Sequence, residues 1–145
     1  MKKIVIASDH AGFELKQILI QELIQLGFEV DDKGCFSTES VDYPDFAHKA
    51  ADDVDKGIVK QGIVICGSGN GVNMTANKHQ NVRSALCWNE EIARLARLHN
   101  DANIMALPAR YITVEEAIKC LYAFLNTSFE GGRHINRINK IPIKQ

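Results

Sequence analysis

The chain has 145 residues, of which 46% are hydrophobic and 24% charged, and its formal net charge at pH 7 is −1. These values are typical of a single soluble globular domain, here spanning residues 1–145, and exclude a disordered or fibrous chain. The near-neutral charge argues against a broad nucleic-acid-binding face, and no apolar run approaches the roughly 20 residues that a membrane span requires.

The first half of the chain alternates predicted strands and helices. A β-branched run predicts a buried strand at 3–8. Leucines at three- or four-residue spacing predict a helix within 12–27, closed by a glycine. A short strand is expected at 28–32. A turn-rich loop then leads to Pro44, which can open a helix that runs to about Lys56.

The second half continues this alternation. We expect strands at 62–66, 82–87 and 103–107, and helices at 72–78, 89–100 and 113–125. Asn89 is the expected cap of one helix, and the capping-box pattern that begins at Thr113 predicts the start of another. Strands that alternate with helices predict an α/β fold: a three-layer α/β/α sandwich with a five-stranded parallel Rossmann-like sheet, followed by a basic C-terminal extension.

Polar residues follow three of the predicted strands. Asp9 and His10 come after the first strand, residues 66–71 after the third, and residues 108–110 after the fifth. In open parallel sheets, ligands bind beyond the carboxyl ends of the strands. Three strand ends that offer polar groups therefore predict a binding site at this edge of the sheet.

The stretch ICGSGNGVN, residues 65–73, places three glycines between a predicted strand and a predicted helix. Backbone amides in such a loop can cradle an anion. Gly67 and Gly69 fit the first two positions of the dinucleotide pattern GxGxxG, but the third falls on Val72. No Gly-Lys-Ser/Thr follows, so the loop is not a nucleotide phosphate loop either. The alternative is a tight strand-to-helix turn without a ligand.

Four cysteines are present, with no CxxC pair and no zinc-like spacing. The apolar stretch at the N-terminus stops at Asp9, too early for a signal peptide. We therefore expect a cytoplasmic protein with reduced thiols.

Cys66 differs from the other cysteines in its position. Cys35, Cys87 and Cys120 are expected to be small buried hydrophobes. A cysteine at the carboxyl end of a strand, facing a helix N-terminus, favours the thiolate form and could act as a base or as a nucleophile. Ser68 could donate a hydrogen bond to a substrate or merely cap the helix.

Two further pairs of polar residues have structural and functional interpretations. Asp9 could cap the first helix with His10 in solvent, or the two could act on a ligand. His99 and Asn100 end a predicted helix, where a histidine suits the negative end of the dipole and Asn100 could be the C-terminal cap.

The tail FEGGRHINRINKIPIKQ is rich in basic residues. Arg133 and Arg137 are four residues apart and would share one face of a helix. They could form an ordinary solvated face. Guanidinium groups also fit the oxygens of a phosphate.

Five motifs occur in order along the chain: SDHAGFELK, DYPDFA, ICGSGNGVNMTANK, RLHNDANIMALPAR and FEGGRHINRI. With them, the chain resembles the B-type ribose-5-phosphate isomerases, in the sugar-phosphate isomerase family that also contains the galactose-6-phosphate isomerase subunits. The resemblance implies conversion of D-ribose 5-phosphate to D-ribulose 5-phosphate through an enediolate, with no metal and no organic cofactor. It also implies a homodimer or a tetramer, active sites built from two chains, and a tail at about 128–145 that packs at the dimer interface.

The resemblance also assigns catalytic roles. Cys66 would be the base that moves a proton between sugar C2 and C1. Amides of Gly67–Gly71 would face the enediolate oxygens, with Ser68 assisting. Asp9 and His99 would act in ring opening, with His99 as the acid on the ring oxygen.

The remaining residues would bind the sugar phosphate. The phosphate ligands implied by the resemblance are His10, Arg110, Arg133 and Arg137. Asn100 would bind a sugar oxygen, and Tyr43 and His134 are further candidates for the pocket wall. The implied substrate-binding residues are Asp9, His10, Gly67, Ser68, Gly69, Asn70, Gly71, Asn100, Arg110, Arg133 and Arg137.

One branch of the family lacks the cysteine and uses a glutamate from the helix after the glycine loop. Here Val72, Asn73 and Met74 open that helix, so the resemblance points to Cys66 as the base. The nearest alternative is an isomerase of six-carbon phosphates such as allose or galactose 6-phosphate. A non-catalytic nucleotide- or flavin-binding module and a thiol-dependent phosphatase or oxidoreductase are alternatives from other classes.

Overall fold

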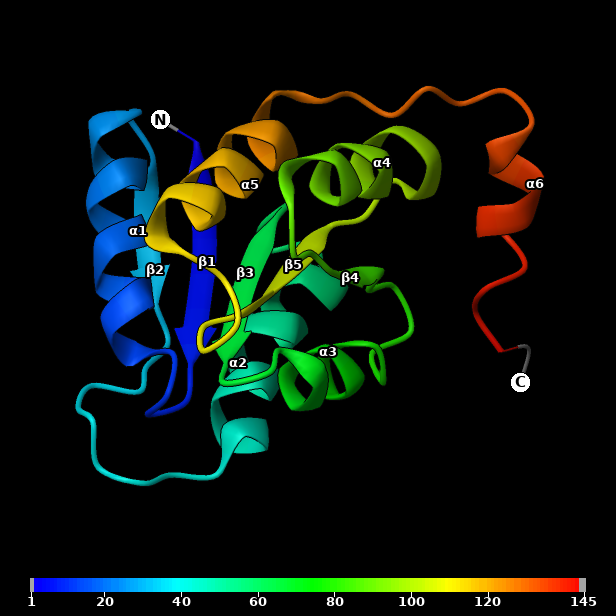
Figure 1. Cartoon of the computed structure of the whole chain (residues 1–145). Coiled ribbons are helices and arrows are strands. Elements are labelled where there is room, and N and C mark those ends of the chain that lie inside the picture. Colours follow the sequence, from blue (N-terminus) through cyan, green and yellow to red (C-terminus); the bar gives the residue numbers. More distant parts are fainter. Residues whose placement is uncertain (1, 144–145) are drawn as a thin grey trace.

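The computed structural model describes residues 2–143, which form five strands and six helices (Figure 1). In chain order they are β1 (Lys3–Ser8), α1 (Phe13–Gln25), β2 (Glu29–Asp32), α2 (Tyr43–Asp55), β3 (Gly62–Cys66), α3 (Asn70–Ala76), β4 (Ser84–Leu86), α4 (Glu90–Asn100), β5 (Ile104–Pro108), α5 (Val114–Asn126) and α6 (His134–Ile138).

The five strands form one parallel sheet in the order β2-β1-β3-β5-β4. Every residue of β3 and β5 is buried, as continuous apolar runs predict for strands covered on both faces. From β1, the chain goes to β2 on one side and then to β3 on the other, so β1 and β3 flank a topological switch point. Ligands of open α/β sheets bind at the carboxyl ends of the strands at this point.

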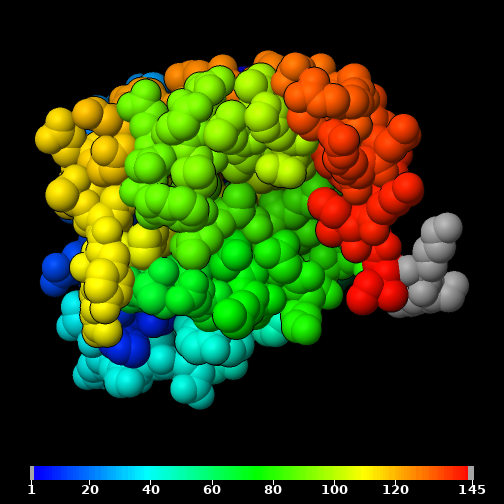
Figure 2. Space-filling view, turned by 45° about the vertical axis from the view of Figure 1, so that its right-hand side comes forward, coloured from blue at the N-terminus to red at the C-terminus, as the bar shows by residue number. Residues whose placement is uncertain are grey.

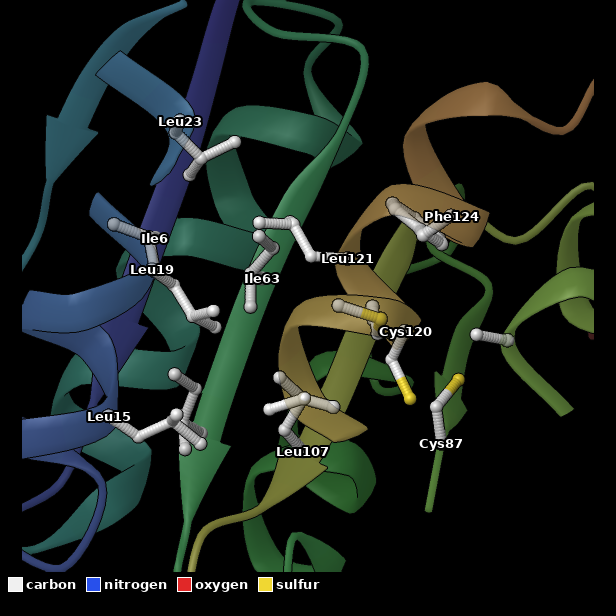
Figure 3. Packing of buried hydrophobic residues seen from close by; sticks show 14 of the residues in the cluster. Ile6, Leu15, Leu19, Leu23, Ile63, Cys87, Leu107, Cys120, Leu121 and Phe124 are labelled. Carbon is white, nitrogen blue, oxygen red and sulfur yellow. The ribbon is translucent and has the colours of Figure 1, made fainter. Parts of the chain in front are cut away.

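Two apolar clusters hold helices on the two faces of the sheet. On one face, Leu19 of α1 and Leu121 of α5 point toward Ile63 of β3 (Figure 3). On the other face, Ala50 and Val72 belong to a cluster under α2 and α3. The predicted three-layer α/β/α fold is confirmed.

Local capping explains where two helices begin. Asn89 Oδ1 accepts a hydrogen bond from the Ile92 amide at 2.9 Å, as predicted. Thr113 Oγ1 accepts one from the Glu116 amide at 3.0 Å, which is half of the predicted capping box. The carboxylate of Glu116 instead accepts from the Glu90 amide at 2.9 Å, and so joins the start of α5 to the start of α4.

Two predicted boundaries were wrong. The helix after the glycine loop begins at Asn70 instead of Val72, because Gly69, with φ +76°, already completes the turn. The strand expected at 82–87 covers only Ser84–Leu86, because β4 is at the edge of the sheet and pairs with β5 alone.

After α5, the chain runs past α4 to the short helix α6 and continues beyond it (Figure 1). The Glu130 amide donates a 3.0 Å hydrogen bond to the Leu98 carbonyl and so fixes this segment to the last turns of α4. In the space-filling view, the segment covers one side of the molecule next to α4 (Figure 2). Ile135, Ile141 and Ile143 are exposed on it. Among residues 2–143, no helix is both long enough and apolar enough to cross a bilayer.

Candidate active site

The carboxyl ends of β1, β3 and β5 meet at one edge of the sheet. The strand registers place Ser8 beside Ile65 and Cys66 beside Pro108. The Asp9 amide donates to the Ile65 carbonyl at 3.1 Å, so the pairing continues past the end of β1. The polar residues that follow these strands therefore lie together, as the alternating pattern predicted.

The loop from the end of β5 is bound directly to the glycine loop. The Ala109 amide donates to the Cys66 carbonyl and the Arg110 amide to the Gly67 carbonyl, both at 2.9 Å. A Cβ atom on Gly67 would be 3.3 Å from the Arg110 side chain. Arg110 thus lies beside the glycine loop, and its role as a phosphate ligand stays a prediction.

The glycine loop has little room for side chains. Gly69 has φ +76°, and a Cβ atom there would be 2.5 Å from Leu86 Cδ1. A Cβ atom on Gly71 would be 2.5 Å from the ring of Tyr43, which opens α2. Both glycines are therefore required by close contacts. The ring of Tyr43 therefore lies against the glycine loop, and its role in a pocket wall stays a prediction.

Three amides of this loop have no partner. Within residues 2–143, the amide groups of Gly67, Ser68 and Gly69 donate no hydrogen bond. Ser68 Oγ accepts from the Asn70 amide at 3.3 Å, and the side chain is exposed. The N-cap of α3 is Gly69, so Ser68 is not the helix cap that the structural alternative expected. A row of free amide donors can bind an oxyanion.

Cys66 lies at the end of β3, directly before these amides. Its side chain is only 5% exposed and belongs to the apolar cluster under α2 and α3. All four cysteines are free and buried. In a single chain, the Cys66 thiol therefore packs like a small hydrophobic group. Its residue is nevertheless the last one before the glycine loop. Its role as a base stays a prediction.

Asp9 and His10 have defined hydrogen-bond states. Asp9 is 7% exposed, and its Oδ1 accepts from the Gly12 amide at 3.0 Å. Its Oδ2 accepts no hydrogen bond within residues 2–143, so one oxygen serves the turn before α1 and the other is free. His10 Nδ1 accepts from the Val41 amide at 3.1 Å. In a neutral ring the proton is then on Nε2, which can donate to a ligand.

A second group of candidate residues lies at the other end of the sheet. His99 and Asn100 end α4, and Arg133 and Arg137 lie at exposed positions at the start and end of α6. β5 begins just after α4 and runs four residues before it pairs with Cys66. Four residues of strand span about 13 Å. One chain therefore does not bring this group to Cys66 (Figure 1).

His99 is held in a small polar cluster. Its ring stacks on that of His134, with centroids 4.6 Å apart and an interplanar angle of 19°. The Oε2 atom of Glu130 is 3.8 Å from His99 Nε2 and 3.5 Å from His134 Nε2. Sequence reasoning missed Glu130. The sequence did offer one indication: Glu130 is four residues before His134, and the two glycines between them, Gly131 and Gly132, allow the chain to turn back.

The expectation that Asn100 is the C-terminal cap of α4 was wrong. Asp101, with φ +47°, takes the left-handed conformation instead. The Asn100 carbonyl accepts a 3.2 Å hydrogen bond from Arg83 Nε, and the Asn100 residue is exposed. Its side chain is therefore free to contact a ligand or another chain.

Comparisons with known proteins find similar chains along nearly the whole sequence. The profile of the family described as Ribose/Galactose Isomerase matches residues 4–141. Ribose-5-phosphate isomerase B of Escherichia coli strain K12 is 42% identical over 141 residues, which make up 97% of this chain and 95% of that protein.

Solved structures give the same result. A ribose 5-phosphate isomerase from Thermotoga maritima is 48% identical, with a TM-score of 0.95 over 97% of both chains. Ribose-5-phosphate isomerase B from Mycoplasma genitalium, solved with bound ribulose-5-phosphate, is 47% identical, with a TM-score of 0.92 over 96% of this chain and 93% of that one. The similarity thus covers nearly the whole fold.

Proposed function

The chain belongs to the ribose/galactose isomerase family, and from this premise we propose that it interconverts D-ribose 5-phosphate and D-ribulose 5-phosphate through an enediolate. The observation that carries the proposal is the row of free amides at Gly67–Gly69 between Cys66 and Arg110, at the switch point of the sheet. The relative with bound ribulose-5-phosphate supports a pentose phosphate as substrate.

The chemical step needs a base and a site for negative charge. Removal of the proton at sugar C2 builds negative charge on the carbonyl oxygen, and each fixed amide donor can lower this barrier by about 3 kcal/mol. In the proposal, Cys66 takes the proton from C2 and returns it to C1, while the hydroxyl proton of O2 passes to O1, so that the aldehyde becomes an alcohol and C2 becomes the ketone. The amides of Gly67–Gly71 face the two oxygens, and Ser68 and Asn70 line the loop. Asp9, with one free carboxylate oxygen, acts in ring opening.

The phosphate end of the substrate requires cationic and donor groups. Arg110 already lies beside the loop, and His10 presents an Nε2 donor when neutral. Arg133 and Arg137 complete the phosphate contacts, and the phosphate supplies binding energy that orients the reacting carbons.

The second group of residues requires a partner. His99 and Asn100 lie about 13 Å along β5 from the glycine loop, and Arg133 and Arg137 lie on α6, which contacts α4. In the proposal, these four residues serve the site of a neighbouring chain. We therefore propose a homodimer in which α6 and the tail pack at the interface and His99 of one chain acts as the ring-opening acid for the other. The exposed Ile135, Ile141 and Ile143 fit such an interface, because apolar side chains gain stability when buried. Sedimentation equilibrium tests this, since a monomer would contradict it.

A test of the proposed activity follows the proton. Ribose 5-phosphate incubated with the protein should yield ribulose 5-phosphate, observed by NMR, and no conversion would contradict the proposed activity. In D₂O, deuterium should appear at C1 only to the extent that the thiol proton of Cys66 exchanges with solvent before it is returned. The same assay with allose 6-phosphate or galactose 6-phosphate separates the six-carbon alternative. Faster turnover of a six-carbon phosphate would overturn the choice of substrate while leaving the proton-transfer mechanism intact.

A further inference from the structure

Three side chains with metal-binding atoms converge where the tail meets the end of α4. They are His99, Glu130 and His134, and their candidate ligand atoms all lie within 4.8 Å of one another. Glu130 Oε2 is 3.5 Å from His134 Nε2 and 3.8 Å from His99 Nε2. Both separations are too long for a hydrogen bond. In a tetrahedral zinc site, each ligand atom is about 2.0–2.1 Å from the ion, which places two ligand atoms about 3.3 Å from each other. The two observed separations are close to this value.

His134 contributes the second observation. Its residue is only 8% exposed, and its Nε2 is buried without a hydrogen-bond partner among residues 2–143. An unpartnered buried nitrogen is costly. Because this nitrogen is next to the Glu130 carboxylate, a bound cation would satisfy both groups.

The backbone holds the three ligands in place. The Glu130 amide donates to the Leu98 carbonyl at 3.0 Å, one residue before His99. Gly131 and Gly132, with φ +74° and +60°, then turn the chain so that His134 returns toward Glu130. The His134 amide donates to the Gly131 carbonyl at 3.3 Å and closes this turn. The backbone is therefore already ordered, and only the two imidazole rings, which are stacked on each other, have to turn for their lone pairs to meet at one ion.

The donor set indicates the class of cation. Two imidazole nitrogens with one carboxylate suit Zn²⁺ and related divalent transition metals, whereas Mg²⁺ and Ca²⁺ prefer oxygen ligands. Three protein ligands would leave a fourth position for water. In the single chain, the side chains of His99 and Glu130 are 37% and 46% exposed.

We propose that His99, Glu130 and His134 form a reversible site for a divalent transition metal such as Zn²⁺. The site has a consequence that rests on the function proposed above. A metal bound to His99 occupies the lone pair that the ring-opening acid needs for its proton, so Zn²⁺ inhibits isomerisation. Substrate and metal then exclude each other.

The first experiment measures binding without reference to activity. Zn²⁺ is titrated calorimetrically into the full-length protein, and Co²⁺ binding is followed by the visible absorption of a tetrahedral ion. Unaltered protein should bind one ion per chain at this site. Glu130→Gln and His134→Gln should each weaken Zn²⁺ binding at least tenfold. Glu130→Asp, which keeps the carboxylate, should retain more affinity than Glu130→Gln.

His48 provides the matched control. Its Nδ1 is 2.8 Å from His79 Nε2, so it belongs to another histidine pair, on the other side of the sheet from α4. His48→Gln should leave Zn²⁺ affinity unchanged, and Cys66→Ser should do the same. The proposal is overturned if unaltered protein binds no Zn²⁺, or if the loss occurs in His48→Gln or Cys66→Ser while Glu130→Gln keeps its affinity. Circular dichroism checks that each variant is folded.

The second experiment measures inhibition. Zn²⁺ should raise the apparent KM for ribose 5-phosphate, and a chelator should restore activity. Glu130→Gln should require at least tenfold more Zn²⁺ for the same inhibition. Inhibition of unaltered protein and Glu130→Gln at equal Zn²⁺ would overturn the link to His99. If the protein proves not to isomerise this substrate, the calorimetric result still decides the metal site.

Discussion

The amide of Asp9 donates a 3.1 Å hydrogen bond to the carbonyl oxygen of Ile65, so the chain after β1 stays paired with β3 up to the residue before Cys66. A carboxylate and a thiol are thereby fixed on neighbouring strands at the switch point of the sheet. The free oxygen of Asp9 and the free amides after Cys66 both lie at this edge. The expected effects of changing them follow from this arrangement.

Replacing Cys66 with Ala should abolish isomerisation and leave the fold intact. Loss of the base lowers the rate by about 10²–10⁴-fold, while loss of one buried sulfur costs stability only modestly. Cys120→Ala is the matched control, because Cys120 is a buried free cysteine in the cluster on the other face. Activity in Cys66→Ala equal to that in Cys120→Ala, in a coupled assay, would remove Cys66 from the mechanism.

Asp9→Asn should separate the structural role of Asp9 from its chemical role. The amide oxygen of Asn can still accept from the Gly12 amide, as Asp9 Oδ1 does at 3.0 Å, so stability should change little. The free oxygen loses its charge, and kcat/KM with the ring form of the substrate should fall about 10²-fold or more. Urea denaturation and steady-state kinetics give the two readouts. Unchanged kinetics would exclude a role of Asp9 in ring opening.

Gly69→Ala and Gly57→Ala should differ in stability although both glycines have positive φ, +76° and +74°. A left-handed alanine costs about 1–2 kcal/mol at either position. At Gly69 the methyl group would also meet Leu86 Cδ1 at 2.5 Å, whereas at Gly57 it meets nothing within 4 Å. Overpacking should add about 1–3 kcal/mol to the loss of unfolding free energy at Gly69. Equal losses in urea would show that the loop relaxes around a side chain.

The thiols of Cys87 and Cys120 should make stability fall at alkaline pH. Burial raises the pKa of each from 9.0 to about 12. Between pH 9 and 12, the unfolded chain has lost these protons while the folded chain keeps them, so the free energy of unfolding decreases as pH rises through this window. Denaturation at pH 8 and pH 10.5 should show the decrease, and the double variant Cys87→Ala, Cys120→Ala should show less of it. An equal slope in both proteins would contradict the assignment.

The sheet and its helices could be predicted because each buried parallel strand is a short continuous apolar run, as in Gly62–Cys66. The same pattern placed Asp9, Cys66 and Arg110 at one edge. Sequence spacing did not reveal which residues lie at the opposite edge. His99 is there because α4 runs antiparallel to β5, which reverses the direction of the chain.

Contacts between distant segments also escaped prediction. Lys16 is fully buried and bonds Asp32 at 2.7 Å, a pairing between α1 and β2 that no local pattern indicates. Glu130 reaches His99 only because its backbone is tied to α4. The left-handed cap of α4 is at Asp101, whose carboxylate accepts a 2.9 Å hydrogen bond from Arg97 Nη1 in the preceding turn of the helix.

The most direct measurement mixes two inactive variants, Cys66→Ala and His99→Asn. In a mixed dimer, one of the two sites would take its thiol from one chain and its imidazole from the other, both unaltered. Random exchange of subunits at equal concentrations makes half of the dimers mixed, so roughly a quarter of the unaltered activity should return. Activity that stays at the level of the separate variants after proven subunit exchange would contradict a site in which the Cys66 loop of one chain works with His99 of its partner.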